Sequence, residues 1–461
     1  MELKDSAANM SMHGFGRIFI SKSKRIQFVW LVIMICNLVI FNICFISLLR
    51  YYLSNPSMTK SETVITSKIR FPSVTVCGPS VSKHKLERFA EESNKTIQVD
   101  FDVNKKFPHP FFRSEEILQN LSTVENYWRI IPDMESLFMT NTSGFCTFAT
   151  LEKCNFTSDI GRVPVFYKGV CNKVNMNGKY FQKKPGSLHG LSFILFVNVS
   201  DVVPWALSSE GDSVYVDIKE FDEPVFHGSG SILASVGQLT RIEISKTVVT
   251  RLKSPFHSNC TNGENKPLLF EGTYTIENCH ITCALNMAHK QCKSIDFHSN
   301  MFLPEHMRKN STNISEAAAC STSIYNYLID TNFESCHCQL PCMETKFHKT
   351  VSTAKWPPKN DLPAYKALAS AAFGLNKSEV TDEFIRNNFL KIDVYFGELS
   401  FQKITEVEEF TTVKLISDIG GQMGIWLGAS VFSVVELLFL LWQSIKYFVN
   451  RNNITEEHPD N

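Results

Sequence analysis

Two long apolar runs stand near the two ends of this chain of 461 residues. The first, residues 26–49, carries no charged side chain, and a helix of that length spans a hydrocarbon core of about 30 Å. The second, residues 415–441, is equally long but holds polar and charged side chains, among them Asp418, Gln422, Ser430, Ser433 and Glu436. Charges within a span are costly and face protein or water. The pattern predicts a membrane protein with two transmembrane helices, the second bordering a polar path.

Basic residues flank both runs on the sides away from the segment between them. Lys22, Lys24 and Arg25 precede the first run, and Lys446 and Arg451 follow the second. Because basic residues favour the cytoplasmic side, we expect both termini inside the cell and the protein in the plasma membrane. The predicted parts are a cytoplasmic N-terminus (1–25), the two spans (26–49 and 415–441), an extracellular domain (50–414) and a cytoplasmic tail (442–461).

A cleaved signal peptide is the alternative interpretation of the first run. The apolar region of such a peptide is about 7–15 residues long and is followed by a small-residue cleavage site. Residues 26–49 are longer, and the run ends in LLRYYLSNP. A membrane span therefore fits better.

The segment between the runs has the marks of an extracellular domain. It holds twelve of the fourteen cysteines, while Cys36 and Cys44 fall in the first run. An even number of cysteines in an oxidising compartment implies about six disulfides. Zinc binding is the alternative for the C-x-C and C-x3-C spacings, but no His-rich partner motif accompanies them, so no metal is expected. Nine N-x-S/T glycosylation motifs also lie here, at Asn94, Asn120, Asn141, Asn155, Asn198, Asn259, Asn310, Asn313 and Asn376.

Short patterned segments predict a mixed extracellular fold. Alternation of apolar and polar residues predicts strands at 69–77, 191–199, 213–218, 241–249 and 389–396. Helices are expected at 114–121, 279–291 and 364–373. Strands scattered along the chain with helices between them predict an α+β domain.

Charge and motif content narrow the function. The formal net charge is zero and the pI is about 7.2, so nothing favours nucleic acid as a partner. The sequence contains no G-x-S-x-G, H-E-x-x-H or G-x-x-x-x-G-K-[ST], so no enzymatic activity is expected. Two alternatives stay open, a membrane-anchored ectoenzyme and a two-span receptor or adhesion protein. Neither would need Asp418 and Glu436 within a span.

Four motifs stand at distinct places along the chain. His13-Gly14 precedes the first run, and FPSVTVC (71–77) follows it. A cysteine-rich stretch ends in C-x-C-x-x-P-C (336–342), and residues 417–430 read SDIGGQMGIWLGAS. Together these motifs resemble the degenerin/epithelial sodium channel family, which includes acid-sensing and peptide-gated channels. The resemblance covers nearly the whole chain, and the last motif is the most specific.

The resemblance implies a homo- or heterotrimer of related subunits whose second spans line a sodium-conducting pore. Gly428-Ala429-Ser430 would form the narrow filter, with the helix interrupted there and backbone carbonyls facing the ions. The permeant ion would be Na⁺, with an amiloride-like molecule as a pore blocker and no cofactor. His13, Gly14 and Ser417 match positions that act in gating.

The residues of the second run support a pore independently. Gly420, Gly424 and Gly428 recur every four positions, which predicts one helical face along which helices approach closely. Helix packing alone does not explain Asp418 and Glu436. Rings of carboxylates from several copies around a water-filled path do explain them, because such rings attract and hold cations.

The resemblance also implies a disulfide pattern that uses all twelve cysteines of the extracellular segment. Acid-sensing members have one further bridge, for which Ser294 replaces one half here and the other half is also absent. The implied pairs are Cys77–Cys171, Cys146–Cys154, Cys260–Cys342, Cys279–Cys338, Cys283–Cys336 and Cys292–Cys320.

Gating is the least constrained property. At the positions of two carboxylates that acid-sensing relatives use, this chain has Ser323 and Tyr327, and the facing loop carries His227 and Gly228. These residues do not supply the acid trigger of that subfamily, and the peptide-gated branch of the family implies instead a sodium-selective channel gated by an extracellular agonist such as a neuropeptide. A constitutive or acid-gated channel of the same family is the alternative.

Overall fold

The computed structural model describes residues 15–78, 82–92, 129, 146–149, 152–155, 158–165, 169–201, 212–226, 230–264, 266–295, 297–309, 314–376 and 378–455. These residues fall into two compact units. The helical unit covers the described parts of Met1–Thr59, Ser254–His257 and Glu406–Asn461. The disulfide-rich unit covers those of Lys60–Lys253 and Ser258–Thr405. The helix expected at 114–121 lies outside the described residues, as do His13, Gly14, His227 and Gly228.

The N-terminal part of the helical unit is a long apolar helix preceded by a short one. α2 (Phe15–Ile20) leads into α3 (Lys24–Leu53), and Gln27 Nε2 donates to the Ser21 carbonyl at 2.7 Å across the turn between them. The mean hydropathy of α3 reaches 2.6, and none of its residues is buried. α3 contains the expected first span and is long and apolar enough to cross a membrane.

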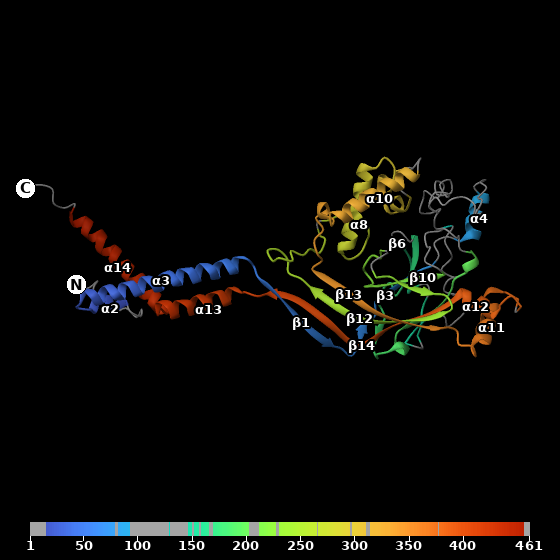
Figure 1. Ribbon diagram of the computed structural model, residues 1–461, viewed down its shortest axis with the longest axis horizontal. Coiled ribbons are helices and arrows are strands. Elements are labelled where there is room, and N and C mark those ends of the chain that lie inside the picture. The colour runs from blue at the N-terminus through green and yellow to red at the C-terminus, as the bar shows by residue number, and fades with distance from the viewer. Residues whose placement is uncertain are drawn as a thin grey trace, which may run out of the picture. The chain divides into compact units, whose positions relative to one another are not determined.

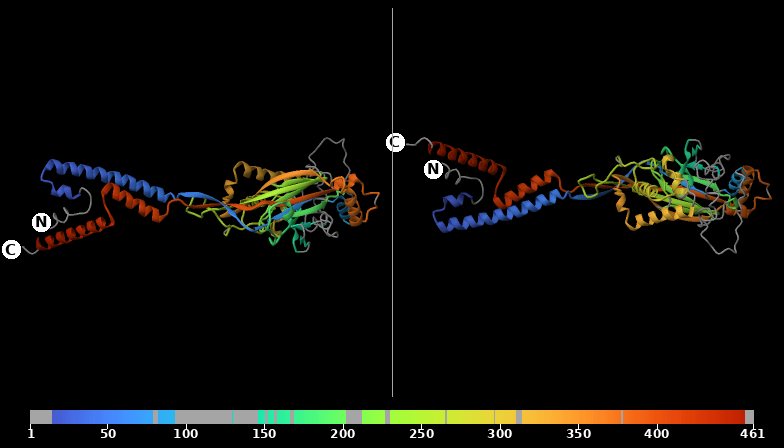
Figure 2. Two further views of the ribbon diagram at one scale, coloured as in Figure 1. Left: turned by 90° about the horizontal axis from the view of Figure 1, so that it is seen from below. Right: turned by 90° about the horizontal axis from the view of Figure 1, so that it is seen from above.

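The C-terminal part of the helical unit is a broken helix. α13 (Thr412–Gln422) continues into the π-helix η6 (Met423–Leu427). Three residues outside any helix separate η6 from α14 (Val431–Thr455). The stretches on either side of the break meet at 71° and, taken as one span, are also long and apolar enough to cross a membrane. α3 lies against α13 and η6, as the views of this unit in Figures 1 and 2 show.

Sheets of seven, five and two strands organise the described part of the disulfide-rich unit. The seven-stranded sheet has the order β13-β12-β14-β9-β4-β5, with β1 paired to β14. β12 runs parallel to β14 and antiparallel to β13. The strands of the seven-stranded sheet are β1 (Ser57–Ile65), β4 (Cys146–Phe148), β5 (Glu152–Lys153), β9 (Leu191–Phe196), β12 (Gln238–Thr250), β13 (Met343–Lys355) and β14 (Phe389–Glu408).

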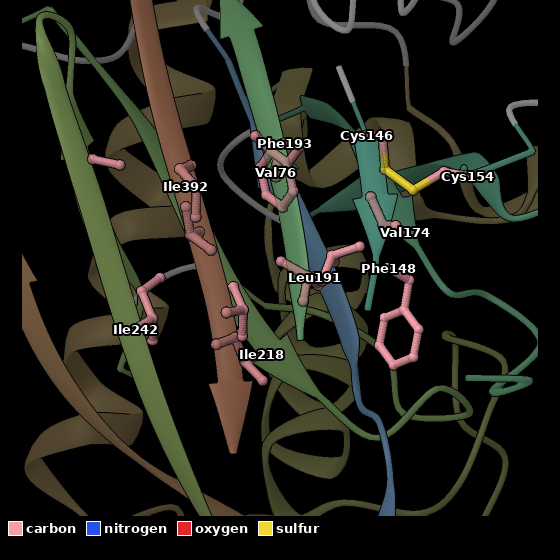
Figure 3. Close-up of a cluster of buried hydrophobic side chains, with 14 of the residues drawn as sticks. Val76, Cys146, Phe148, Cys154, Val174, Leu191, Phe193, Ile218, Ile242 and Ile392 are labelled. Carbon is pink, nitrogen blue, oxygen red and sulfur yellow. A yellow bond between two sulfur atoms is a disulfide. The ribbon is translucent and has the colours of Figure 1, made fainter. Parts of the chain in front are cut away.

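The five-stranded sheet has the order β11-β10-β3-β7-β6, and β2 pairs with β8 in a separate ribbon. The strands are β2 (Ile69–Arg70), β3 (Ser73–Cys77), β6 (Ile160–Val165), β7 (Gly169–Val174), β8 (Phe181–Gln182), β10 (Ser213–Lys219) and β11 (Ile232–Ser235). Figure 3 shows their apolar side chains packed with those of the larger sheet, Val76 and Ile218 beside Leu191, Phe193 and Ile392.

The FPSVTVC motif anchors this core. The Phe71 side chain is fully buried, and its ring lies 5.2 Å from that of Phe148 and 5.9 Å from that of Phe396. Asn175 Nδ2 donates to the carbonyls of Phe71 and Pro72 at 2.9 and 3.1 Å. Because proline has no N–H to give to a ladder, the strand expected at 69–77 is divided into β2 and β3 at this point.

Helices surround the sheets of this unit. α8 and α10 belong to the cysteine-rich stretch, and α11 and α12 pack on Phe389 at the start of β14. The described helices are α4 (Lys83–Glu92), α8 (Ile276–Gln291), α9 (Phe297–Phe302), α10 (Ile314–Asp330), α11 (Leu362–Phe373) and α12 (Asp382–Asn388), with short 3₁₀ turns at Ser187–His189, Val199–Asp201, Glu305–Met307 and Glu334–Cys336.

Candidate ion pathway in the helical unit

The candidate pathway begins at α13, which follows β14 after a three-residue connection. Thr411 caps the helix, its side chain accepting a hydrogen bond from the Lys414 amide at 3.3 Å. Asp418 lies half-buried near the middle of α13, while Ser417 beside it is exposed. A turn further on, Gln422 Oε1 accepts from Trp426 Nε1 at 2.8 Å, which satisfies one polar group within the apolar run.

The helix then loosens and stops at Gly428. The π-helix η6 has wider hydrogen-bonded turns than an α-helix, and such segments recur at functional sites. Gly428 has φ of 58°, a left-handed conformation that favours glycine, and the Ala429 amide donates to the Met423 carbonyl at 3.2 Å. The interruption expected at Gly428-Ala429-Ser430 is therefore present in the backbone.

Two serines restart the helix through a reciprocal cap. The Ser430 amide donates to Ser433 Oγ at 3.1 Å, and the Ser433 amide donates to Ser430 Oγ at 3.4 Å. This is the arrangement of a capping box, with a serine in place of the usual glutamate or glutamine at the third helical position. The cap fixes the backbone direction on the C-terminal side of the break.

The polarity of α14 is inverted relative to a helix of a water-soluble protein. Ser433 is only 3% exposed and Glu436 is half-buried. Val431 and Phe432, by contrast, are 80% and 79% exposed. A helix with polar groups inside and apolar groups outside suits an apolar solvent, because lipid offers no partner for the polar groups.

The glycines do not form the single regular face that their spacing predicts. Gly420 lies in α13 and Gly424 in the π-helix, which shifts the helical phase between them, and Gly428 lies outside both helices. An added Cβ at Gly420, Gly421 or Gly424 would meet no heavy atom within 4 Å. The spacing of the glycines thus holds in sequence, but their common face is broken by the π-helix and the turn.

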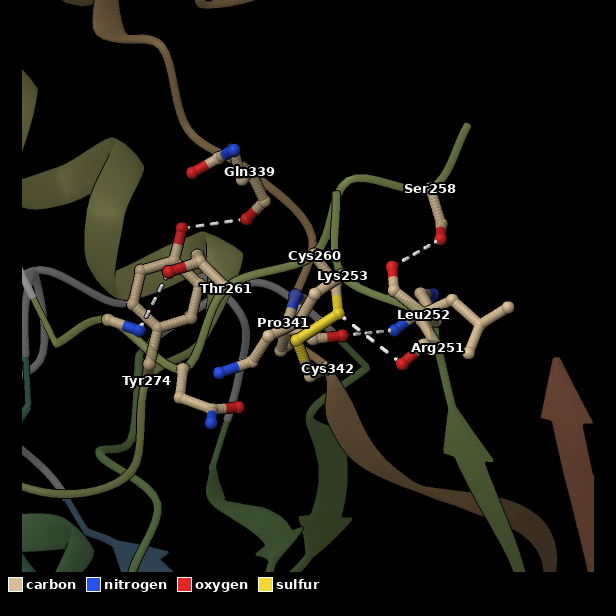
Figure 4. Close-up of a disulfide and its surroundings, with 12 residues drawn as sticks. Arg251, Leu252, Lys253, Ser258, Cys260, Thr261, Tyr274, Gln339, Pro341 and Cys342 are labelled. Carbon is tan, nitrogen blue, oxygen red and sulfur yellow. Dashed lines mark hydrogen bonds between the residues drawn. A yellow bond between two sulfur atoms is a disulfide. The ribbon is translucent and has the colours of Figure 1, made fainter. Parts of the chain in front are cut away.

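The structure joins the twelve cysteines of the disulfide-rich unit in the same six pairs that the resemblance implies. Figure 4 shows Cys260–Cys342 beside Arg251, which donates to the Pro341 carbonyl at 2.9 Å, and Tyr274, which donates to the Gln339 carbonyl at 2.7 Å. Cys36 and Cys44 of α3 are free thiols. Within the described residues no cluster of three or more His, Cys, Asp or Glu side chains could hold a metal ion.

The described glycosylation motifs have accessible asparagines. Asn155, Asn198, Asn259 and Asn376 are all exposed. Asn94, Asn120, Asn141, Asn310 and Asn313 lie outside the described residues. Ser323 and Tyr327 both lie exposed on α10.

The π-helix and the Ser430–Ser433 cap are the site features that sequence reasoning missed. A signal for the cap is present, since two serines three residues apart open an apolar run. The π-helix has no comparable sequence signal, because the i→i+5 pairing depends on the packing around it.

Comparisons with known proteins place these features in a family. The profile of the amiloride-sensitive sodium channel family matches residues 6–440. Acid-sensing ion channel 1C of Danio rerio is 23% identical over 95% of this chain and 83% of its own length. Acid-sensing ion channel 2 of Homo sapiens is 24% identical over 95% of this chain and 86% of its own length. Degenerin unc-8 of Caenorhabditis elegans is 27% identical over 60% of this chain and 36% of its own length. The chain therefore belongs to the amiloride-sensitive sodium channel family, a family of membrane ion channels.

Proposed function

We propose that this chain is a subunit of a sodium-selective cation channel in the plasma membrane and that its broken C-terminal helix lines the pore. The observation that carries the proposal is the interruption at Gly428-Ala429-Ser430 inside an apolar segment in which Ser433 is buried and Asp418, Gln422 and Glu436 are half-buried. Non-helical backbone at membrane depth is tolerated only where it borders protein or water. A water-filled path beside the break would satisfy the polar groups of this non-helical backbone.

The chemistry of the segment suits small cations. Backbone carbonyls at a narrow break can replace part of an ion's hydration shell, and carboxylates on either side raise the local cation concentration. Asp418 precedes the break and Glu436 follows it. Repeated in each subunit, they would form two rings of negative charge along the path.

The exposed surface of the helical unit supports a membrane-embedded assembly. α3 and α14 expose a large apolar surface in the single chain, which lipid or neighbouring subunits must cover. We propose two spans, cytoplasmic termini, an extracellular disulfide-rich domain and three subunits around the pore. The open positions at Gly420 and Gly424 would admit a neighbouring helix.

An extracellular agonist such as a neuropeptide is the proposed trigger, with acid as the alternative. Ser323 and Tyr327 on α10 are not carboxylates, which argues against an acid trigger at these positions. The acid alternative draws support from the names of the relatives, several of which are acid-sensing ion channels.

Whole-cell recording from cells expressing the chain, alone and with related subunits, tests the proposal. We expect a current whose reversal potential follows the sodium gradient and shifts when sodium is replaced by potassium outside. Separate application of acid and of a neuropeptide library discriminates the two triggers. Surface-expressed protein that never conducts, in any subunit combination, would instead favour a receptor or adhesion protein.

A further inference from the structure

A cavity of about 870 Å³ lies within the disulfide-rich unit, between α8, the end of α10, β10 and β13. Its volume is in the range of cavities that hold small organic ligands. Aromatic and aliphatic side chains make up much of its lining, including Ile218, Tyr274, Tyr325, Phe333 and Phe347. His280 stacks on Phe333 with ring centroids 4.0 Å apart, which orders one wall.

The charged lining residues are mostly paired with one another or with neighbours. The pairs are Lys219–Glu277 at 3.4 Å, Lys346–Glu344 at 3.3 Å, Arg251–Glu344 at 2.6 Å and Lys349–Asp217 at 3.3 Å. Among the described residues, no cation lies within ion-pair distance of the Glu223 carboxylate. A carboxylate that lines an aromatic cavity without a counter-ion is suited to a positively charged guest.

The turn that carries Glu223 is held rigidly. Lys173 Nζ donates to the carbonyls of Phe221 and Glu223 at 2.8 and 3.0 Å. The Thr273 amide donates to the Asp222 carbonyl at 2.9 Å. The preceding residue is Gly272, and a Cβ there would come within 2.3 Å of the same carbonyl oxygen, so a larger residue would push the two segments apart. These contacts fix the backbone that carries Glu223, which lowers the entropy cost of binding.

We propose that this cavity binds a ligand that carries a protonated amine or guanidinium next to an apolar body, with Glu223 as the counter-ion. The aromatic walls would contact the apolar body and face the cation, while the carboxylate would fix its charged end. The proposal goes beyond the channel function, because it concerns binding to the disulfide-rich unit and not conduction.

The pH dependence of binding follows from the protonation of Glu223. The pKa of Glu223 is raised to about 7, chiefly by burial, with the nearby carboxylates Glu220, Asp222 and Glu344 acting in the same direction and Lys219 opposing them. A bound cation would favour the carboxylate, so ligand affinity should level off above about pH 8, be roughly halved at pH 7 and fall further as the pH drops. At pH 6 the loss due to Glu223 alone is about tenfold.

Other titratable groups around the cavity must be separated from Glu223. His280 of α8 and His348 of β13 line it and would repel a cation once protonated, and burial lowers the pKa of His280. Both weaken binding in the same direction as protonation of Glu223. The pH dependence of ligand affinity in Glu223→Gln measures the contribution of the histidines. The difference between this profile and that of the wild type is the contribution of Glu223.

The test uses the purified full chain in a neutral detergent, with empty micelles as the blank. 2-Phenylethylammonium is the probe, and 2-phenylethanol is its uncharged counterpart. Saturation-transfer NMR titrations at pH 8 should give at least tenfold tighter binding for the ammonium. Glu223→Gln should remove that preference, Glu223→Asp should keep part of it, and Glu271→Gln, an exposed carboxylate outside the lining, should leave it intact.

Two results would overturn the proposal. One is equal binding of the ammonium and the alcohol to the wild-type chain, which requires no variant to fold. The other is an undiminished ammonium preference in a folded Glu223→Gln protein, as judged by an unchanged melting temperature. Because binding rather than current is measured, a channel that fails to conduct would not affect either result.

Discussion

Gly428 is the residue on which the pathway geometry depends most directly. Its φ of 58° costs an alanine roughly 1–2 kcal/mol, so Gly428→Ala should distort the backbone of the break. We expect lower conductance or a reduced preference for sodium over potassium, measured by single-channel current and reversal potential. Gly428→Asn should disturb permeation less if backbone conformation is decisive, because asparagine tolerates the left-handed region.

Gly374 provides the matched control for that substitution. It has φ of 65° at the end of α11, with nothing within 4 Å of an added Cβ. Gly374→Ala therefore carries a similar backbone strain in the other unit. It should lower expression or stability while leaving permeation unchanged. If Gly428→Ala conducts and selects like wild type, the assignment of the filter to this turn is wrong.

At the scale of elements, the Ser430–Ser433 cap joins the break to α14. Ser433→Ala removes the acceptor of the Ser430 amide at a buried position, at a cost of about 1 kcal/mol. We expect weaker selectivity because the backbone of the break loses one of its fixed points. Ser433→Thr keeps the hydroxyl and should keep selectivity close to wild type. If Ser433→Ala and Ser433→Thr select sodium equally well, the cap does not contribute to ion selectivity.

α8 is capped by a lysine from a distant segment. Lys309 Nζ donates to the carbonyls of His289 and Cys292 at the C-terminal end of the helix. Lys309→Met keeps the apolar stem but leaves these carbonyls without the ammonium. The free energy of unfolding should fall by roughly 1–2 kcal/mol. Lys290→Met, an exposed change on α8 itself, should have little effect in the same denaturation measurement.

The sequence predicts best those strands and helices whose apolar residues recur with a regular spacing. β9, β10, β12, α8 and α11 each overlap a predicted segment, because their alternation or helical spacing reflects one buried face. β13 was missed because it is an edge strand whose side chains are mostly exposed, so no alternation marks it. The pathway residues could be named from their motif, whereas the π-helix and the rotation of Gly428 out of the helix depend on tertiary packing.

At the scale of the whole molecule, the glycosylation motifs test the membrane topology. Asn155, Asn198 and Asn376 are exposed and lie between the proposed spans. Glycosidase treatment of protein from the cell surface should reduce its mass, and Asn→Gln changes at these three sites should reduce the shift stepwise. Modification at Asn9 or Asn453 would contradict cytoplasmic termini.

The number of subunits, three by the family resemblance, can be tested at the exposed surface of α13 and η6. Gly420 and Gly424 leave room beside α13 and η6, and close approach of neighbouring helices is the physical use of such small residues in membranes. Gly420→Val and Gly424→Val should therefore reduce the population of trimers in native mass spectrometry of detergent-solubilised protein. Val413→Leu, an added methylene at an exposed position of the same helix, should not. A wild-type protein that remains monomeric or dimeric would refute the trimer. Trimers unaffected by either glycine change would place the subunit contacts elsewhere, because a valine in a tight helix contact cannot be accommodated without separating the two backbones.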